Sequence, residues 1–506
     1  MVPGSSRRIV KILFALHQFF PEHFAGVEIL TLGLARELKA RGHEPYVFAA
    51  KRSFPIHDME PGEIEDYEYD GIPVRQVGRP KEGLGLHYRL NYENETMADR
   101  AREYVREIGP DVVHAMNFHG LSASVVPAFK EFGVPLVYTA TDFWTICPVV
   151  DLRRHDGEMC RGPDLAHCPR CAMSRPPLIR HPDSQRVIKL LDYAPNVAPR
   201  VAGKLSGARL SNYSRLLRRA HELKERSEYD GRAMDLADRT IRLRERSEYV
   251  RAAAELLDRI VDLKERSEYV GGAMKLVDHI IAPTRLTRDL LASNGVEEEK
   301  IEVSHYGIDA SDILGAPVHR NLPPPLRVGF IGTLAPHKGC DILMRAFKSL
   351  PSELDATLTI YGNLEKFEAF VKKLRELAGE DERITFAGTF PPGRIGPVLT
   401  EMDVLVVPSR WYENTPLVVY SAFAAKTPVI ATDLGGLSEI VKHEENGLLF
   451  ELADAEGLAR QLRRLGEEPG LLEKLRAGIG PVRTIEENVD ELERLYGALV
   501  KERTGI

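Results

Sequence analysis

The strongest chemical pattern in the chain lies in residues 404–430. They begin with an apolar run, Val404–Val407, which has the length of a buried parallel strand. A polar turn follows and supplies three side chains that could contact a ligand, Arg410, Glu413 and Asn414. Because a carboxylate in such a turn can hold a hydroxyl group, Glu413 predicts a polyol as part of the ligand.

The same turn leads into a predicted helix. Thr415 is placed to cap this helix, and Pro416 suits its first position because proline has no N–H to leave unpaired. The first N–H groups of the helix, including that of Leu417, lie at the positive end of its dipole. This arrangement predicts an anion site. A phosphate beside a polyol indicates a sugar nucleotide.

A second turn, residues 332–339, lies between a predicted strand and a predicted helix. Gly332 allows a ligand to approach the backbone, Thr333 follows it, and Lys338 supplies a cation at the helix start. The turn is neither a dinucleotide fingerprint nor a P-loop, so its phosphate interpretation depends on pairing with residues 404–430 at one sheet edge. The alternative is an ordinary turn with a solvated lysine.

Residues of the first half could face the same ligand across a cleft. Gly26 lies in a small turn before a helix, while His114, His119 and Asp142 lie at or just after the carboxyl ends of predicted strands, where sheet ligands bind. His119 could hydrogen-bond to a sugar or phosphate oxygen, and Asp142 could orient an acceptor hydroxyl. A structural role is the alternative for each.

Four of the five cysteines lie within 25 residues and predict a structural zinc site. Cys168 and Cys171 form a C-x2-C turn that could chelate a tetrahedral metal, with Cys147 and Cys160 completing four thiolates. Free thiols, a disulfide or an iron–sulfur cluster are the alternatives. A catalytic zinc is not expected, because four thiolates leave no open position.

The elements that must position these residues alternate between strands and helices in two series. The predicted fold class is therefore α/β, with two doubly wound parallel sheets. We expect a first domain at residues 1–310, a ligand-binding domain at 311–485, and a terminal helix at 486–506.

The alternation breaks at about residues 145–274. This part contains the cysteines, a proline-rich stretch, and three copies of the pentad ERSEY at 225–229, 245–249 and 265–269. A step of 20 residues is not a whole number of helical turns, so the copies would rotate away from a common face. We interpret the region as a helical insertion, a solvated arm or an oligomer contact that could form a homo-oligomer.

The bulk composition is that of an ordinary protein of two or three domains, with 506 residues, 43% hydrophobic residues and a net charge of −7. This charge disfavours a nucleic-acid partner. No apolar run reaches the roughly 18 residues that span a bilayer, and the cysteine content does not suggest a secreted scaffold. A cytoplasmic protein is expected. A basic cluster near the first helix could make peripheral contact with the inner face of a membrane; it comprises Arg36, Lys39, Arg41, Lys51 and Arg52.

Taken together, these motifs resemble the retaining glycosyltransferases of family 4, which have the GT-B fold. The resemblance rests on the turn at Gly26, the sequence Arg41-Gly-His-Glu44, the turn 332–339, Glu413 with its helix, and residues 427–436. It covers nearly the whole chain except residues 145–274. It is specific for the family, though not for one sugar.

The resemblance implies a nucleoside diphosphate sugar donor, UDP- or GDP-linked, and a glycan or lipid-linked acceptor. Lys338 would neutralise the diphosphate, Glu413 would lie beside the donor sugar, and His119 lies near a loop whose histidine approaches the reacting sugar. The family generally needs no catalytic divalent metal. The implied pathway is surface polysaccharide or glycolipid assembly.

Two residues depart from the family pattern. Ser421 stands where a second glutamate holds the ribose, and Thr333 stands where an arginine is often found. The alternative function is therefore a degenerate GT-B module that binds a sugar nucleotide or a partner without transfer. A sugar-nucleotide epimerase is a further alternative.

Overall fold

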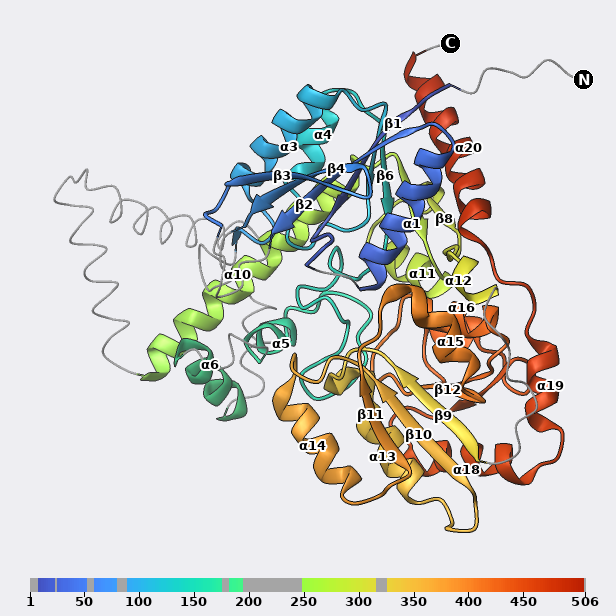
Figure 1. The fold of residues 1–506 in the computed structure, drawn as a ribbon. Coiled ribbons are helices and arrows are strands. Elements are labelled where there is room, and N and C mark those ends of the chain that lie inside the picture. Colours follow the sequence, from blue (N-terminus) through green and yellow to red (C-terminus); the bar gives the residue numbers. More distant parts are fainter. Residues whose placement is uncertain are drawn as a thin grey trace, which may run out of the picture.

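The computed structural model describes residues 8–22, 25–51, 59–79, 89–174, 182–193, 248–314 and 325–504. They form two α/β lobes, one above the other in Figure 1, each built on its own sheet. The sheets have eight and six strands, in the orders β3-β4-β2-β1-β5-β6-β7-β8 and β11-β10-β9-β12-β13-β14.

The first sheet is parallel except at one edge. Its strands are β1 (Lys11–Leu16), β2 (Glu44–Lys51), β3 (Ile64–Tyr69), β4 (Ile72–Gly78), β5 (Val112–Ala115), β6 (Leu136–Thr139), β7 (His279–Ala282) and β8 (Ile301–Val303). The edge strand β3 pairs antiparallel with β4. Asp70 and Gly71 join the two strands, both with positive φ, as a two-residue hairpin requires.

The second sheet is parallel throughout its described pairs. Its strands are β9 (Leu326–Ile331), β10 (Ala356–Tyr361), β11 (Ile384–Gly388), β12 (Val404–Val407), β13 (Val429–Thr432) and β14 (Gly447–Phe450). Two doubly wound sheets confirm the predicted fold class, with the antiparallel β3 as an addition.

Helices cover both faces of each sheet, and four apolar clusters fill the layers between. The helices of the first lobe are α1 (Gly26–Ala40), α3 (Glu95–Ile108), α4 (Val125–Lys130), α11 (Arg285–Ser293) and the terminal α20 (Ile485–Thr504). Those of the second are α13 (Cys340–Lys348), α14 (Glu368–Ala378), α15 (Ile395–Thr400), α16 (Leu417–Ala424), α17 (Gly436–Ile440), α18 (Ala455–Glu467) and α19 (Leu471–Gly478), with α12 (Ser311–Leu314) before β9. Short 3-10 turns are Glu298–Lys300, Pro336–Lys338 and Pro392–Arg394.

The terminal helix α20 belongs to the core of the first lobe, beside α1 in Figure 1. Its buried Tyr496 hydroxyl lies 2.6 Å from Nδ1 of His114 on β5. The chain therefore crosses between the lobes twice. The two crossings pair where Ile308 bonds to the backbone of Arg483 and Ile485.

The described part of the insertion is helical, as expected. It contains α5 (Cys168–Met173), α6 (Pro182–Tyr193) and the long α10 (Glu248–Met274), which crosses the first lobe in Figure 1. The ERSEY copy at 225–229 and most of the copy at 245–249 lie outside the described residues, and the third copy lies on α10.

Candidate active site

The strand order places two ligand-facing loops side by side. In the second sheet β9 neighbours β12, and the chain reverses its winding direction between them, which is where parallel sheets bind ligands. The turn after β9 packs directly on the exit of β12. Gly339 has φ +72°, and a Cβ at this position would lie 1.8 Å from the carbonyl oxygen of Pro408, so only glycine fits.

Glu413 and Lys338 meet at this switch point. Glu413 is buried, and its Oε1 accepts from Lys338 Nζ at 2.7 Å, Ser409 Oγ at 2.6 Å and Trp411 Nε1 at 2.8 Å. Burial alone would raise the pKa of Glu413, but the Lys338 ammonium and the three hydrogen bonds lower this pKa below its ordinary value. The site therefore holds an ionised carboxylate paired with a cation.

Arg410 and Trp411 extend the same surface. Arg410 donates through its backbone N–H to the carbonyl of His337 at 2.8 Å, and its guanidinium donates to Asp341 at 2.8 Å. The centroids of the Trp411 and His337 rings lie 4.3 Å apart, and Lys338 Nζ lies 5.1 Å from the centroid of the Trp411 ring. The two predicted loops thus form one constellation of charged and aromatic groups. Gly332 and Thr333 begin the turn that carries Lys338, and the Gly332 N–H donates to the carbonyl of Tyr361 at 3.0 Å.

The helix after Glu413 starts one residue later than predicted. Pro416 is the N-cap and Leu417 the first helical residue, because the Thr415 hydroxyl donates to the Asn414 carbonyl at 2.6 Å and leaves the helix uncapped by that side chain. Ser421 is turned back on the same helix, since its hydroxyl donates to the carbonyl of Leu417 at 3.1 Å. The prediction that Thr415 caps the helix is therefore wrong.

The N-termini of two helices face each other across the lobes. A Cβ built on Gly26, the first residue of α1, would lie 4.0 Å from Cδ1 of Leu417, the first residue of α16. Both helices direct the positive ends of their dipoles at this junction. An anion held between the lobes would meet both ends.

Asn414 joins the lobes instead of pointing at a ligand. Its Nδ2 donates to the carbonyl of Ala140 at 2.7 Å, and its Oδ1 accepts from the hydroxyl of Thr287. A second contact lies close by, where Glu439 accepts from the backbone N–H groups of Arg285 and Leu286 at 2.8 and 2.7 Å. These contacts explain why the loop after Glu413 carries polar residues that a donor site does not require.

The glycine pair Gly435 and Gly436 packs tightly behind the site. A Cβ on Gly436 would lie 2.5 Å from the carbonyl of Glu413, and one on Gly435 would lie 2.7 Å from both Leu286 and Tyr412. These glycines let α17 approach the Glu413 loop and the first lobe together.

The first sheet has its own switch point, between β1 and β5. His17 follows β1 and its ring stacks on that of His119, which follows β5, with 6.0 Å between centroids. Asn117 accepts from the His17 backbone N–H at 2.9 Å and donates to His17 Nδ1 at 2.7 Å. The Nε2 of His17 then carries the hydrogen and faces the fully buried Glu28 at 3.4 Å.

His114 and Asp142 have different surroundings. His114 is fully buried between Tyr496 and the Thr139 hydroxyl, 2.6 Å from its Nε2, and burial lowers the pKa of His114 to about 3. Its role is structural. Asp142 follows β6 in a loop that contacts the second lobe, and burial raises the pKa of Asp142 to about 6, although the Trp144 N–H at 2.9 Å and the charge of Arg266 lower it.

Zinc binding by the four cysteines stays a prediction. Within the described ranges, which include all four, no group of three or more His, Cys, Asp or Glu side chains could hold a metal ion. Cys160 donates to the Gly162 carbonyl at 3.0 Å, and Cys168 accepts from the Asp164 N–H at 3.2 Å. Burial raises the pKa of Cys147 to about 11 and that of Cys168 to about 12, so both are thiols when no metal is bound.

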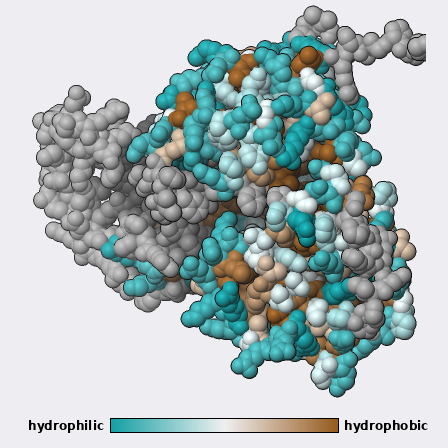
Figure 2. Space-filling model, viewed as in Figure 1, coloured by the Kyte–Doolittle hydropathy of each residue, from teal (hydrophilic) through white to brown (hydrophobic). Residues whose placement is uncertain are grey.

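Three residues of the basic cluster near the first helix form ion pairs. Arg36 pairs with Asp70, Lys51 with Glu65, and Arg41 with Glu37 and Glu493, while Arg52 lies outside the described residues. The face in Figure 2 is mostly hydrophilic, with hydrophobic residues in small separate patches. None of the described helices is long and apolar enough to cross a membrane.

Several site residues were not predicted. Ser409 and Trp411 hold Glu413, and His17, Glu28 and Asn117 form the cluster under His119. Glu28 carried a signal in the sequence, since it interrupts the apolar stripe of the first helix. Ser409 and Trp411 lie in the same turn as Glu413, where any polar side chain is within reach.

Two family models match the chain. The model for "Glycosyltransferase Family 4" matches residues 24–158, and the model for "Glycosyl transferases group 1" matches residues 325–468. Together these ranges cover more than half of the 506 residues. The Cys-bearing and helical insertion falls almost entirely between them.

A D-inositol 3-phosphate glycosyltransferase of Rhodococcus jostii is 34% identical over 214 residues, which are 37% of this chain and 47% of that protein. The chain spans about half the length of the curated relatives it matches. Among solved structures, sucrose-phosphate synthase of Thermosynechococcus elongatus is 17% identical with a TM-score of 0.59, covering 97% of this chain and 99% of that one. HepE of Anabaena in complex with UDP and glucose is 16% identical with a TM-score of 0.55, covering 97% and 100%. These similarities confirm the predicted GT-B fold.

Proposed function

Because the chain belongs to glycosyltransferase family 4, we propose that it transfers a sugar from a nucleoside diphosphate sugar to a glycan or glycolipid acceptor with retention of configuration. The observation that carries the proposal is the Lys338–Glu413 pair at the switch point of the second sheet, in a loop that leads to α16, whose first residue Leu417 lies against Gly26 of α1. The UDP named in the HepE complex supports a UDP-sugar as the first donor to test, with GDP-sugars as the second.

The residues at the switch point suit the departure of a diphosphate. The bond from the anomeric carbon to the phosphate oxygen breaks, and the diphosphate takes the electron pair. Lys338 and the N-terminus of α16 stabilise the negative charge that develops on it. The acceptor oxygen bonds to the anomeric carbon on the same face of the sugar, and its proton passes to the departing phosphate oxygen.

Glu413 and His119 have supporting roles in this proposal. Glu413 accepts a hydrogen bond from a donor hydroxyl with its second oxygen, while the first stays bonded to Ser409 and Trp411. His119, stacked on His17, approaches the reacting sugar from the first lobe. No step requires a catalytic divalent metal.

The test is turnover of UDP- and GDP-sugars by the purified protein with glycan and lipid-linked acceptors, followed by NMR of the new linkage. Retention predicts that the anomeric configuration of the donor persists in the product. Glu413→Ala and Lys338→Ala should each abolish most turnover. Full activity in both variants would contradict the assignments.

A binding module without transfer is the second candidate. Ser421 favours it, because its hydroxyl donates to the Leu417 carbonyl and offers no carboxylate to a ribose. Calorimetry with UDP and GDP separates the two functions, since a module binds a nucleotide but releases no product with any acceptor.

The prediction of a zinc site rests on the cysteine spacing alone, and the arrangement of the described thiols does not support it. Metal analysis decides the matter. About one zinc per chain that is lost in Cys168→Ser but kept in Cys340→Ser, a buried cysteine elsewhere in the fold, would establish the site. Peripheral membrane contact and homo-oligomers through the insertion likewise stay predictions, tested by vesicle co-sedimentation and light scattering.

A further inference from the structure

One copy of the repeated pentad contacts the loop that follows β6, which contains Asp142 and Trp144. Arg266, the arginine of the ERSEY copy at 265–269, is 3% exposed although it lies on a charged helix. Its guanidinium donates to the backbone carbonyl of Trp144 and lies 4.7 Å above the centre of the Trp144 ring. A buried arginine that both bonds and stacks fixes the residue it holds.

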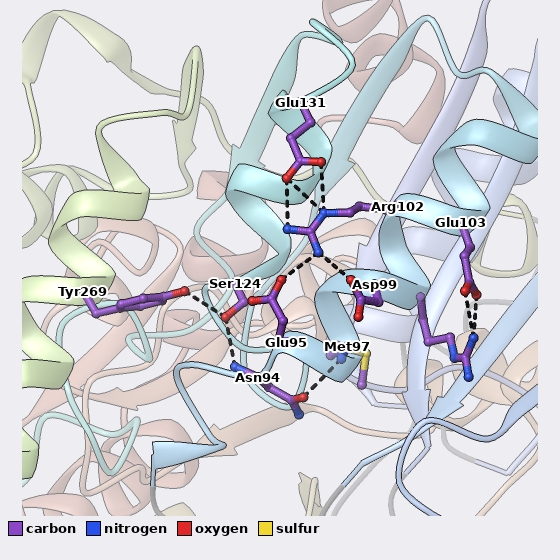
Figure 3. A network of polar contacts seen from close by, with 10 residues as sticks. Asn94, Glu95, Met97, Asp99, Arg102, Glu103, Ser124, Glu131 and Tyr269 are labelled. Carbon is purple, nitrogen blue, oxygen red and sulfur yellow. Dashed lines mark hydrogen bonds and ion pairs between the residues drawn. The ribbon is translucent and has the colours of Figure 1, made fainter. Parts of the chain in front are cut away.

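The pentad is anchored at a second point, one helical turn further along. The Tyr269 hydroxyl lies 2.9 Å from Ser124 Oγ, which accepts from the backbone N–H of Asn94, and Asn94 in turn caps α3 through Met97 (Figure 3). Lys264 and Glu268 form an exposed pair on α10. The pentad therefore docks by one face, through Arg266 and Tyr269.

Trp144 lies four residues after Ala140 in the loop that follows β6, and this loop also contacts the second lobe. The carbonyl of Ala140 accepts from Asn414, and the ring of Phe143 lies 6.4 Å from that of Tyr412. Asp142 lies between these contacts, and its carboxylate accepts from the Trp144 N–H at 2.9 Å. Arg266 thus holds Trp144 in the same loop in which Ala140 contacts Asn414, the residue next to Glu413.

We propose that Arg266 is a positioning residue for acceptor binding. Arg266 holds Trp144 in place, and Trp144 in turn orients the Asp142 carboxylate towards the acceptor. This inference rests on the proposed transferase function and extends it to the insertion. The acceptor group that Asp142 would bind is a hydroxyl, and Arg266 itself does not touch the substrate.

The electrostatic surroundings of Asp142 make the role measurable. Besides Arg266 on α10, the groups near Asp142 are the phenols of Tyr138 on β6 and Tyr306 after β8. Both phenols stay neutral because burial raises the pKa of Tyr138 and that of Tyr306. Arg266 is therefore the charge that lowers the pKa of Asp142, and its removal should shift the acid limb of activity to higher pH.

The experiment compares Arg266→Met, which keeps much of the stem, with Arg266→Lys and with Arg246→Met in the second copy of the pentad. With the donor and acceptor used by the wild type, Arg266→Met should lower kcat/KM for the acceptor by about tenfold or more. The dissociation constants for UDP and GDP should change less than about twofold. Arg266→Lys should recover part of the loss and the wild-type acid limb, and Arg246→Met should behave as the wild type.

A fluorescence measurement tests the contact without any substrate. The chain has two tryptophans, so Trp411→Phe leaves Trp144 as the reporter. In that background Arg266→Met should change the Trp144 emission and its quenching by acrylamide, while Arg246→Met should not. Changed emission without transferase activity in the wild type would refute the proposed function and the acceptor role together.

The proposal is overturned if folded Arg266→Met keeps the acceptor kcat/KM and the acid limb of the wild type. It is also overturned if Arg246→Met causes an equal loss, because the effect would then belong to the helix in general. Circular dichroism and thermal melting identify a variant that fails to fold, and Arg266→Lys then carries the comparison.

Discussion

Lys338 Nζ lies 2.7 Å from Glu413 Oε1, although 75 residues separate the two along the chain. The parallel pairing of β9 with β12 brings their loops together, so that each charge neutralises the other before a ligand arrives. The pair is asymmetric, because Glu413 is buried and Lys338 is about one quarter exposed. Lys338 can therefore turn towards a phosphate, while Glu413 stays bonded to Ser409 and Trp411.

Replacing either member of this pair should weaken donor binding and stability together. We expect Lys338→Met to raise the dissociation constant for the bound nucleotide by about tenfold or more, because a charge-assisted contact to phosphate is lost. The buried carboxylate left behind should lower the free energy of unfolding by about 1–3 kcal/mol. Calorimetry and urea unfolding measure the two effects. In a double-mutant cycle with Glu413→Gln, strictly additive losses would show that the two side chains are not coupled.

Two glycines with nearly the same positive φ make it possible to distinguish the cost of steric crowding from the cost of backbone strain. Gly339 has φ +72° and its Cβ would collide with the Pro408 carbonyl, whereas Gly388 has φ +74° and nothing within 4 Å of its Cβ. Gly388→Ala should lower the free energy of unfolding by only about 1–2 kcal/mol, the strain of a left-handed residue. Gly339→Ala should lower the free energy of unfolding further. It should also reduce nucleotide affinity, because the turn that carries Lys338 must move away from Pro408 at the end of β12. Equal losses of stability with unchanged affinity would contradict this geometry.

His114 should make the protein sensitive to mild acid. The folded state keeps His114 neutral down to a pKa of about 3, while the unfolded chain takes up the proton near pH 6.5. As pH falls below 6.5, the unfolded state binds the extra proton and the free energy of unfolding decreases by up to about 1.4 kcal/mol per pH unit. The melting temperature of the wild type should therefore fall more between pH 7 and pH 5 than that of His114→Gln. His443→Gln, at an exposed position of the second lobe, is the control for replacing a histidine.

Glu439 should stabilise the contact between the lobes through the start of α11. Its carboxylate accepts from two backbone N–H groups, those of Arg285 and Leu286, at the positive end of that helix. Glu439→Ala should lower the free energy of unfolding by about 1 kcal/mol and speed hydrogen exchange in residues 284–293. Glu445→Ala, an exposed acid in the same lobe, should change neither. Unchanged exchange in Glu439→Ala would mean that water replaces the carboxylate without loss.

The order of elements and the position of the site could be predicted from the sequence, because both depend on local patterns. The apolar run Val404–Val407 and the glycine-bearing turn at 332–339 each signal a strand end, and the switch-point rule then brings Lys338 to Glu413. The hairpin at Asp70 and Gly71 was missed although Asp-Gly is a known turn signal, since β3 alternates charged and aromatic residues.

Contacts between the lobes could not be predicted in the same way. Asn414 looks like any polar residue of a binding loop, and only the folded chain shows that Ala140 and Thr287 occupy its side chain. The docking of Arg266 cannot be predicted either, because the three pentads carry the same residues and nothing in their sequence shows that Arg266 packs on Trp144. Such choices depend on partners more than 100 residues away, which no local pattern encodes.

The return of the last helix to the first lobe has a consequence for how the protein is made. A ribosome releases β1, α1 and β5 early, but Tyr496, which bonds to His114, follows the whole second lobe in the chain. Until then the apolar face that α20 covers, formed by residues such as Leu34 and Leu38, is open to solvent or to a chaperone. The second lobe has all its strands and can complete its core first. The first lobe to be translated is therefore the last to finish folding, and truncation before residue 485 should leave a nascent chain prone to aggregation.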